Sequence, residues 1–492
     1  MKKKLSQNVA KNDFFGKNIL FLGLMIAVYI LTFSFLAIQR HNAFASNFDL
    51  ANMDQTLWNT INGRFFSLST AQGTLSRLSI HADFILILLA PLYLIWNDVR
   101  MLLIAQTIFI AFGAVPIYLL TTKLLGSSMW ALVISALYLL YPSLQWVNIY
   151  DFHPVSLAIP FLLFAFYYSY QKKWREYFLF VLLAIITKEQ VSLIIAMWGV
   201  LQIILFKEKK LGLISLFLGL AWFPIMVFLV IPNFGPSGQH WAFDVWFKDP
   251  KDQVSQNPLL GVGNLISSFF SFEAINYYLG LLKPLLFLPL LGLPFLLVSL
   301  PDLGINVISS FPEMRSNILH YDSALIPGLF LGTIFGLQYA VRFFLKYFPN
   351  EYRWLRKKQK LLALLVLTPV FFLSIVKGPL PLNPFCWCGI YYVGENEKKF
   401  AQLLSTIPPE ASIAASREIR AHLTHREHAF DINEMAFETE YLALIDQQRY
   451  IGNFYPREYE IELKNRLKFD PRYELIFDRG HYSLFRRINS QY

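Results

Sequence analysis

The sequence predicts an all-α polytopic membrane protein that ends in a small soluble α/β domain. Of the 492 residues, 55% are hydrophobic and only 15% are charged, and the mean hydropathy is +0.43. A soluble chain of this length could not cover so much apolar surface. The 46 Phe, 25 Tyr and 11 Trp suit lipid-facing surfaces and the aromatic belts at membrane interfaces.

The net charge of +10 is divided unevenly between two parts of the chain. Residues 395–492 hold 14 Lys and Arg against 16 Asp and Glu, whereas the rest of the chain holds 29 against 17. An excess of basic residues in a membrane protein is typical of cytoplasmic loops beside anionic lipid. The charge therefore gives no indication of a nucleic-acid partner, and it separates an embedded part from a soluble tail.

The first span is predicted over residues 19–37. Basic residues precede it within the tail 1–17, which places the N-terminus in the cytoplasm of a multi-pass plasma-membrane protein. No clear small-residue cleavage site follows the run, so we interpret it as a retained helix rather than a signal peptide. Residues 39–80 are then expected to form a first, polar loop outside the cytoplasm.

About 10–12 membrane segments are predicted within residues 18–376. The segment 84–96 is short for a span and is expected to be re-entrant or interfacial, because a full crossing there would place Lys123 outside against the positive-inside rule. The stretch 301–320 is similarly ambiguous. The further apolar segments are 84–96, 101–120, 129–147, 155–170, 177–206, 211–232, 274–300, 323–345 and 361–376.

Two helical hairpins are predicted to present polar residues at their outer tips. About thirty apolar residues separate the basic turns 172–175 and 207–210, and only Lys188 and Glu189 interrupt them. A hairpin would place this pair on the outer side. By the same argument, residues 151–154 form the tip of the hairpin between 129 and 170.

A second outside loop is expected over 233–272, and a soluble domain over 377–492 that follows the Pro-rich connector 378–381. Since the basic cluster 353–360 is predicted to be cytoplasmic, this domain is expected outside the cytoplasm. Its pattern predicts strands at 412–415 and 441–445, helices at 418–423 and 456–468, and a terminal hairpin of 473–477 with 482–485.

Ionisable residues gather at the predicted outer face. Each is costly to keep in or beside a membrane span, so each is a candidate for a functional role. A structural explanation exists for several of them: Asp49 or His153 as a helix cap, Lys188 with Glu189 as an internal ion pair, and Asp54 as a partner of the loop backbone. Their convergence nevertheless favours one site. The members are Asp49, His81, Asp83, Asp151, His153, Lys188, Glu189, His320 and Tyr321.

This set suits a particular chemistry. A carboxylate could deprotonate an acceptor hydroxyl, and Lys, Arg and His could bind a phosphate that leaves. The adjacent membrane would accommodate a lipid tail while the lipid headgroup reached these residues. This combination fits the transfer of a sugar from a polyprenyl phosphate. No Walker-type phosphate loop occurs. Cys386 and Cys388 are too close for a routine disulfide and too few for a zinc site. A divalent metal is compatible with the set, although no ligand cluster demands one.

The chain resembles, over nearly its whole length, the membrane protein family known as domain of unknown function 2079. The resemblance rests on seven motifs in the right order. They are FDLANMDQTLWNTINGRFF (48–66), HADFILILLAPLYLI (81–95), YDFHP (150–154), TKEQ (187–190), AWFPIMVFLVIPNF (221–234), ILHYDSALIP (318–327) and IPPEASIAAS (407–416).

That family looks related to the GT-C glycosyltransferases, multi-pass enzymes that use lipid-phosphate sugars. The resemblance implies an acidic base in the first outside loop, which corresponds to Asp49, and a donor-binding lysine in a TK(E/G) motif, which corresponds to Lys188. The first loop of GT-C enzymes often carries adjacent acidic residues, whereas Asp49 and Asp54 are five apart. Either could therefore be the base, and Asp49 is favoured because it lies nearest the first span.

The resulting hypothesis is a GT-C-like membrane glycosyltransferase that uses a polyprenyl-phosphate sugar and a glycan, lipid or protein acceptor. The alternatives are a transporter or lipid flippase, which would predict an internal repeat that we do not find, and a non-catalytic scaffold that displays the tail. The expected catalytic residues are Asp49 and Asp54. The residues expected to bind the donor phosphate or substrate are Lys188, Glu189, His81, Asp151, His153, Arg315, His320 and Tyr321.

Overall fold

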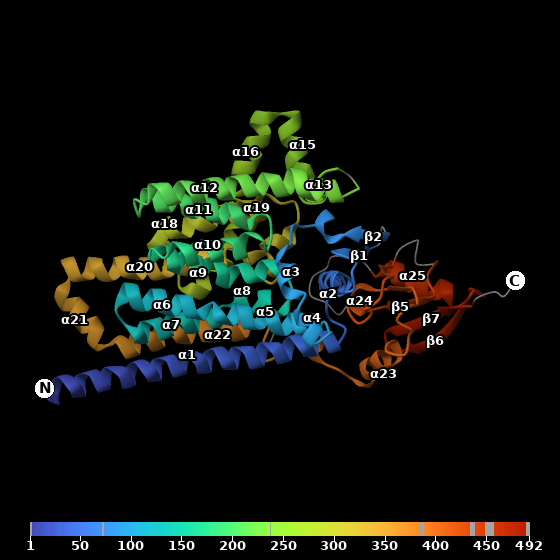
Figure 1. Cartoon of the computed structure of the whole chain (residues 1–492), viewed down its shortest axis with the longest axis horizontal. Helices are drawn as coiled ribbons and strands as arrows, with labels where there is room; N and C mark the ends of the chain where they lie inside the picture. Colours follow the sequence, from blue (N-terminus) through green and yellow to red (C-terminus); the bar gives the residue numbers. More distant parts are fainter. Residues whose placement is uncertain are drawn as a thin grey trace.

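The computed structural model describes residues 2–70, 73–236, 238–383, 388–432, 438–447 and 457–488. Its apolar part is a bundle of helices that run along the long axis of the molecule, and the C-terminal domain lies at one end of this bundle (Figure 1). The predicted fold class is confirmed: membrane helices are followed by a small domain built on a sheet. Cys386 lies outside the described residues.

Within the described residues, seven helices are long and apolar enough to cross a membrane. The helix α7 (Ser128–Leu139) and the helix α8 (Pro142–Ile149) together form one further candidate, bent by 48°. Three shorter apolar helices cover Ile85–Ile95, Pro154–Tyr170 and Val191–Ile204. The seven are Gly16–Asn42, Arg100–Leu125, Lys209–Phe234, Pro258–Leu285, Leu288–Ile308, Ile326–Tyr347 and Gln359–Lys377.

The segment 84–96 forms two short helices, α3 (Ile85–Leu89) and α4 (Leu92–Ile95). Neither is long enough to cross a bilayer, which requires about 20 helical residues. The expectation that this segment is not an ordinary span therefore agrees with its length in the structure.

The bundle has a basic end and an end that carries the soluble domain. The long helix α1 (Lys2–Asn42) begins at the left of Figure 1, where the helix α21 (Pro349–Lys357) also lies, and it ends beside the C-terminal domain. The helix α12 (Lys209–Pro224) begins at the same basic end. Basic residues at one end of a bundle are typical of its cytoplasmic side.

The hairpin predicted around Lys188 is present as α10 (Trp174–Ile185) and α11 (Val191–Ile204). The helix α11 also packs closely against α12, because glycine removes the side chains between them: a Cβ atom at Gly199 would lie 2.6 Å from the carbonyl oxygen of Gly212. Small residues allow such approaches between membrane helices.

The first loop is a folded unit that the sequence did not reveal. It contains the helix α2 (Phe48–Ile61) and a hairpin of β1 (Ser67–Thr70) and β2 (Gly73–Ser76). The Asn47 side chain caps α2 by accepting a hydrogen bond from the Phe48 amide. Most of α2 is buried between the bundle and the C-terminal domain.

The C-terminal domain is a five-stranded mixed sheet with the strand order β4-β3-β5-β7-β6. The predicted strands are confirmed as β3 (Ile413–Ala415) and β5 (Tyr441–Ile445), and the terminal hairpin as β6 (Tyr473–Arg479) and β7 (Tyr482–Arg487). The predicted helices are α24 (Arg417–Arg420) and α25 (Glu458–Leu467), whereas α23 (Glu395–Leu404) and the edge strand β4 (Ala429–Asp431) were not predicted.

The domain is docked on the bundle by a buried aromatic residue. Phe44, which follows α1, is fully buried in the core of the C-terminal domain beside Phe400 and Tyr482. Burial of a phenylalanine side chain contributes about 1.5–3 kcal/mol. Since α2 begins four residues after Phe44, this anchor also holds the start of α2 beside the domain.

Candidate functional site

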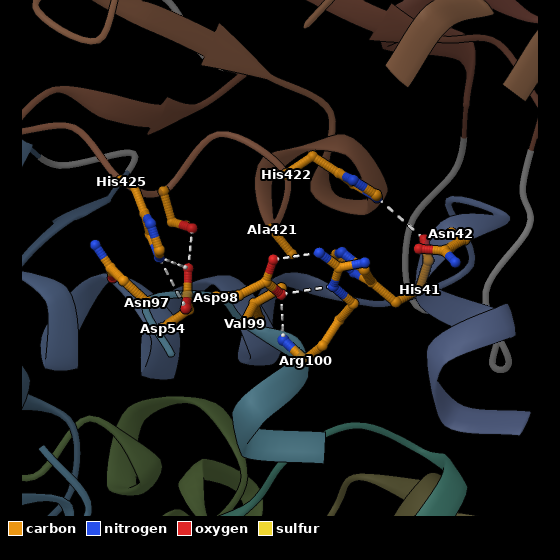
Figure 2. Close-up of a pocket in the computed structure, with 11 residues that line it drawn as sticks. His41, Asn42, Asp54, Asn97, Asp98, Val99, Arg100, Ala421, His422 and His425 are labelled. Carbon is orange, nitrogen blue, oxygen red and sulfur yellow. Dashed lines mark hydrogen bonds and ion pairs between the residues drawn. The ribbon is translucent and has the colours of Figure 1, made fainter. Parts of the chain in front are cut away.

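The helix α2 separates two polar hollows. The first, which we call the Asp49 cavity, has a volume of about 550 Å³ and is lined by Asp49, Arg77, His81, His153, Lys188 and His320, among others. The second, the Asp54 pocket, has a volume of about 300 Å³ and is lined by Asp54, His41, Asp98, Arg100, His422 and His425, among others (Figure 2).

Asp49 lies in the first turn of α2 and faces the first of these hollows. Its side chain is 21% exposed, and its Oδ2 lies 3.4 Å from Nε2 of His153, which is too long for a well-formed hydrogen bond. Burial opposes ionisation of Asp49, but His153 and the charges of Arg77 and Lys188 outweigh it and lower its pKa. Asp49 is therefore an ionised carboxylate with acceptor capacity to spare.

Lys188 reaches the same cavity from the turn between α10 and α11. Only 7% of the residue is exposed, yet its ammonium group has no hydrogen bond or ion pair with any residue that the structure describes. A buried charge without a partner is costly. The site therefore provides a cation that has no direct ion-pair partner among the described residues.

His81 and Glu189 form a second carboxylate–histidine pair. Nδ1 of His81 lies 2.8 Å from Oε1 of Glu189, whose Oε2 accepts the amide of Ala82 at 3.2 Å. Burial lowers the pKa of His81 to about 4, although Glu189 opposes this. In neutral His81 the proton on Nδ1 is donated to Glu189, so that Nε2 is an acceptor.

His240 completes a group that could hold a divalent cation. Its Nε2 lies 3.5 Å from Oε1 of Glu189, and the three ligand atoms of His81, Glu189 and His240 lie within 4.8 Å of one another. Two imidazoles and a carboxylate form a common zinc ligand set. However, Nδ1 of His240 accepts the amide of Ala242 at 3.1 Å, so neutral His240 carries its proton on Nε2. A metal ion bound to Nε2 would therefore have to replace that proton.

His153 and His320 form one wall of the Asp49 cavity. Their rings are stacked with centroids 3.6 Å apart, and Tyr321 lies beside His320 with ring centroids 4.2 Å apart. Burial and the charges of His153 and Lys188 lower the pKa of His320 well below its usual value. Its Nδ1 is buried and has no hydrogen-bond partner in the part of the chain that the structure describes. This wall is both aromatic and polar.

Three of the predicted binding residues do not line the cavity, and one of them, Glu189, is the partner of His81 described above. Asp151 is fully buried and pairs with Arg40 at 2.6 Å, which ties the end of α1 to the turn after α8. Arg315 donates hydrogen bonds to carbonyls at the end of the helix α19 (Leu300–Ile308), the shortest at 2.7 Å to Ser309. Asp151 and Arg315 therefore have structural partners. The expectation that they bind a substrate arose because sequence position alone does not show which way a side chain points.

Asp54, the second predicted base, faces away from the cavity. It is fully buried, and the Tyr93 hydroxyl donates to it at 2.5 Å. Thr424 donates to its other oxygen, and Nε2 of His425 lies 3.2 Å away. Figure 2 shows His425 reaching Asp54 from the C-terminal domain. Asp54 thus joins three segments of the chain.

Sequence reasoning missed several residues of the cavity wall. Arg77 lines it and is held by Asp83, to which its Nε donates at 2.8 Å. Trp241 and Trp246 come from the second loop, and Asp431 comes from the C-terminal domain. The tryptophans in an otherwise polar loop were a signal that could have been used. For Asp431 no signal exists in the sequence.

The bundle of apolar helices, with a polar cavity near its junction with a small soluble domain, defines a polytopic membrane protein. The chain belongs to the family described as "Predicted membrane protein (DUF2079)", whose profile matches residues 40–466. No curated protein sequence matches it.

The structure is similar to the crystal structure of ArnT from Cupriavidus metallidurans bound to undecaprenyl phosphate. The TM-score is 0.54 with 11% sequence identity, and the match covers 96% of this chain and 98% of that chain. At this identity the similarity concerns the fold, and the residues of the cavity must be judged from their own geometry.

Proposed function

We propose that this protein is an integral membrane glycosyltransferase that moves a sugar from a polyprenyl-phosphate donor to an acceptor outside the cytoplasm. In this proposal the N-terminus is cytoplasmic, and the Asp49 cavity and the C-terminal domain face the outer side of the plasma membrane. The observation that carries the proposal is the unpaired Lys188 ammonium group in the same cavity as an ionised carboxylate.

The reaction would proceed by direct displacement. Asp49 accepts the proton of an acceptor hydroxyl while that oxygen forms a bond to the anomeric carbon of the donor sugar. The bond between the anomeric carbon and the phosphate oxygen breaks, and the polyprenyl phosphate leaves with the electron pair. Lys188 stabilises the negative charge that develops on this phosphate. The proton then passes from Asp49 to water.

The neutral histidines suit the sugar better than the phosphate. Neutral His81 donates its only N–H group, on Nδ1, to Glu189, so its Nε2 is free to act as an acceptor. An acceptor nitrogen binds a hydroxyl group and cannot donate to a phosphate oxygen. We therefore assign the phosphate to Lys188 and the hydroxyl groups to His81 and to the wall that His320 forms.

The bundle also contains an apolar cavity that suits the lipid tail. It has a volume of about 260 Å³ and is lined largely by leucines of α17 (Phe272–Leu282), of residues 290–303 and of α20 (Ile326–Tyr347). Leu325, which lines it, follows His320 by five residues, so one loop borders both hollows. A lipid could place its tail here and its phosphate near Lys188.

The first test is binding of undecaprenyl phosphate to the purified full-length protein in nanodiscs. Lys188→Met should weaken binding about 10- to 100-fold, because a hydrogen bond to a charged group contributes about 1.5–3 kcal/mol. The matched control is Lys210→Met, an exposed lysine at the basic end of the bundle. Asp49→Asn should retain binding, since it removes the base and keeps the phosphate site. Unchanged affinity in Lys188→Met would contradict the proposal.

A further inference from the structure

The second outside loop forms a helical hairpin that stands away from the rest of the molecule. It consists of α15 (Lys248–Gln256) and α16 (Pro258–Ser268). Figure 1 shows both helices projecting from the bundle, across the direction in which α12 and α20 run. No residue of α15 is buried, and in α16 only Gly261 is. The hairpin therefore presents almost all of its surface to its surroundings.

The two helices have opposite chemistry. The helix α15 reads KDPKDQVSQ and is polar, whereas α16 reads PLLGVGNLISS and is largely apolar. On α16, Leu259 is 90% exposed, Leu260 62% and Ile266 58%. Phe270 and Phe272 extend the same apolar surface beyond the helix. An exposed patch of this kind marks an interaction site, because contact with water would be unfavourable.

The two helices are packed as one unit. A Cβ atom at Gly261 would lie 2.6 Å from Cα of Val254, so the helices meet where the side chain is missing. Nδ2 of Asn264 donates to Oε1 of Gln253 at 3.1 Å across the same contact. The polar and the apolar side of the hairpin consequently keep a fixed orientation to each other.

The hairpin starts at the wall of the Asp49 cavity. Val245 and Trp246 line that cavity, and α15 begins two residues later. The carbonyl of Trp246 accepts the amide of Ser310 at 2.9 Å, and its ring stacks on Phe311. These contacts hold the base of the hairpin at the end of the bundle that carries the C-terminal domain. In Figure 1, α15 lies on the side of this domain and α16 on the side of the membrane helices.

We propose that this hairpin is an interfacial membrane element whose partner is the outer leaflet of the bilayer. The helix α16 lies in the plane of the membrane with its leucines among the acyl chains, and α15 lies over it in the headgroup region. An amphipathic arrangement of this kind binds a membrane surface without crossing it. Exposed apolar residues continue along the chain from α16 into α17, where Ile275 is 46% exposed. By length and composition, Pro258–Leu285 could instead cross the membrane.

Depth measurements in nanodiscs separate these two arrangements. Bimane is attached at Leu259→Cys, Ile266→Cys or Ser255→Cys in a full-length background with Cys386→Ser and Cys388→Ser. Quenchers are placed either near the headgroups or near the bilayer centre. Positions 259 and 266 should have the same shallow depth, and quenching there should exceed that at 255 by about threefold or more, because only α16 enters the acyl region.

A membrane-spanning α16 would give a different pattern. Seven residues correspond to about 10 Å along a helix, so positions 259 and 266 would then differ in depth by a similar distance. That result would overturn the proposal. Lipid quenching that is absent at all three positions would overturn it as well, since the apolar surface would then face another protein. Neither outcome affects the assignment of Lys188 or Asp49.

Discussion

Asp49 and Asp54 lie on one helix, five residues apart, and their surroundings differ in almost every respect. Asp49 faces a cavity of about 550 Å³, with a single histidine at 3.4 Å. Asp54 is enclosed and accepts hydrogen bonds from Tyr93 and Thr424, with His425 at 3.2 Å. A carboxylate whose oxygens are already used cannot accept a proton from a substrate without losing those bonds. The comparison therefore favours Asp49 as the base and a structural role for Asp54.

The two hollows differ in the same way. In the Asp49 cavity, Lys188 has no partner among the described residues, and Nδ1 of His320 is buried without one. In the Asp54 pocket, Arg100 is paired with Asp98 and His422 lies 3.0 Å from the carbonyl of His41, although Nδ1 of His41 is buried without a partner among the described residues (Figure 2). The contrast therefore lies in the cations, because Arg100 has an ion-pair partner and Lys188 has none among the described residues.

The largest expected difference is in the rate of sugar transfer. Asp49→Asn should reduce it about 10²- to 10⁴-fold, which is the usual contribution of a general base. Asp54→Asn should change it only a few fold, because Asp54 does not touch the cavity. The measurement is restoration of the surface glycan profile in a deletion strain, with protein levels matched. Equal losses in both variants would remove the distinction between the two carboxylates.

The reverse order is expected for stability. Asp54→Asn places an amide donor against Tyr93 or Thr424 and should cost about 1–3 kcal/mol, the penalty for a buried unsatisfied group. Asp49→Asn should cost much less, because its only close partner lies at 3.4 Å. Thermal unfolding of the purified protein in nanodiscs measures both. Tyr93→Phe, which removes one donor, should fall between them, and a larger loss in Asp49→Asn would contradict the comparison.

The smallest expected effect is a pH dependence of domain docking. Burial opposes charge on His425, but Asp54 outweighs it and raises the pKa of His425. A raised folded-state pKa means that this stabilisation is fully present below the unfolded pKa of about 6.5 and is lost as the pH rises through the folded-state value.

The stabilisation that Asp54 provides, measured as the difference in unfolding temperature between the wild type and Asp54→Asn, should therefore shrink as the pH is raised from about 5.5 to about 8.5. The buried histidines with a lowered pKa, such as His81, are present in both proteins and largely cancel in this difference. The difference between the wild type and Asp49→Asn should not follow this course, because Asp49 does not contact His425. A wild-type to Asp54→Asn difference that stays constant over this range would contradict the role of Asp54.

Part of the candidate site could be predicted because membrane proteins keep few ionisable residues in or beside their spans. Asp49, His81, His153, Lys188, His320 and Tyr321 were grouped on this argument, and all of them line one cavity. Their roles stay predictions. The same argument placed Asp151 in the group, and Arg315 was added to the expected binding residues, but Asp151 pairs with Arg40 and Arg315 binds the end of α19. Burial cost indicates that a charge needs a partner, and it does not say whether that partner is a ligand or another residue.

By itself the sequence determined the class of the protein, the separation into an embedded part and a soluble domain, and most strands of that domain. These features depend on composition and on local periodicity, which are properties of the chain alone. Only the tertiary structure decided that the first loop folds as α2 with a hairpin, that His240 joins His81 and Glu189, and that Asp431 reaches the cavity.

It also decided between the two carboxylates of α2. In a helix with 3.6 residues per turn, two side chains five residues apart point in directions that differ by about 140°. Asp49 and Asp54 can therefore face different hollows. Which hollow contains the unpaired lysine depends on the turn between α10 and α11, more than a hundred residues away. No local sequence pattern encodes the position of Lys188 relative to Asp49, because this position results from the packing of helices that are far apart in the sequence.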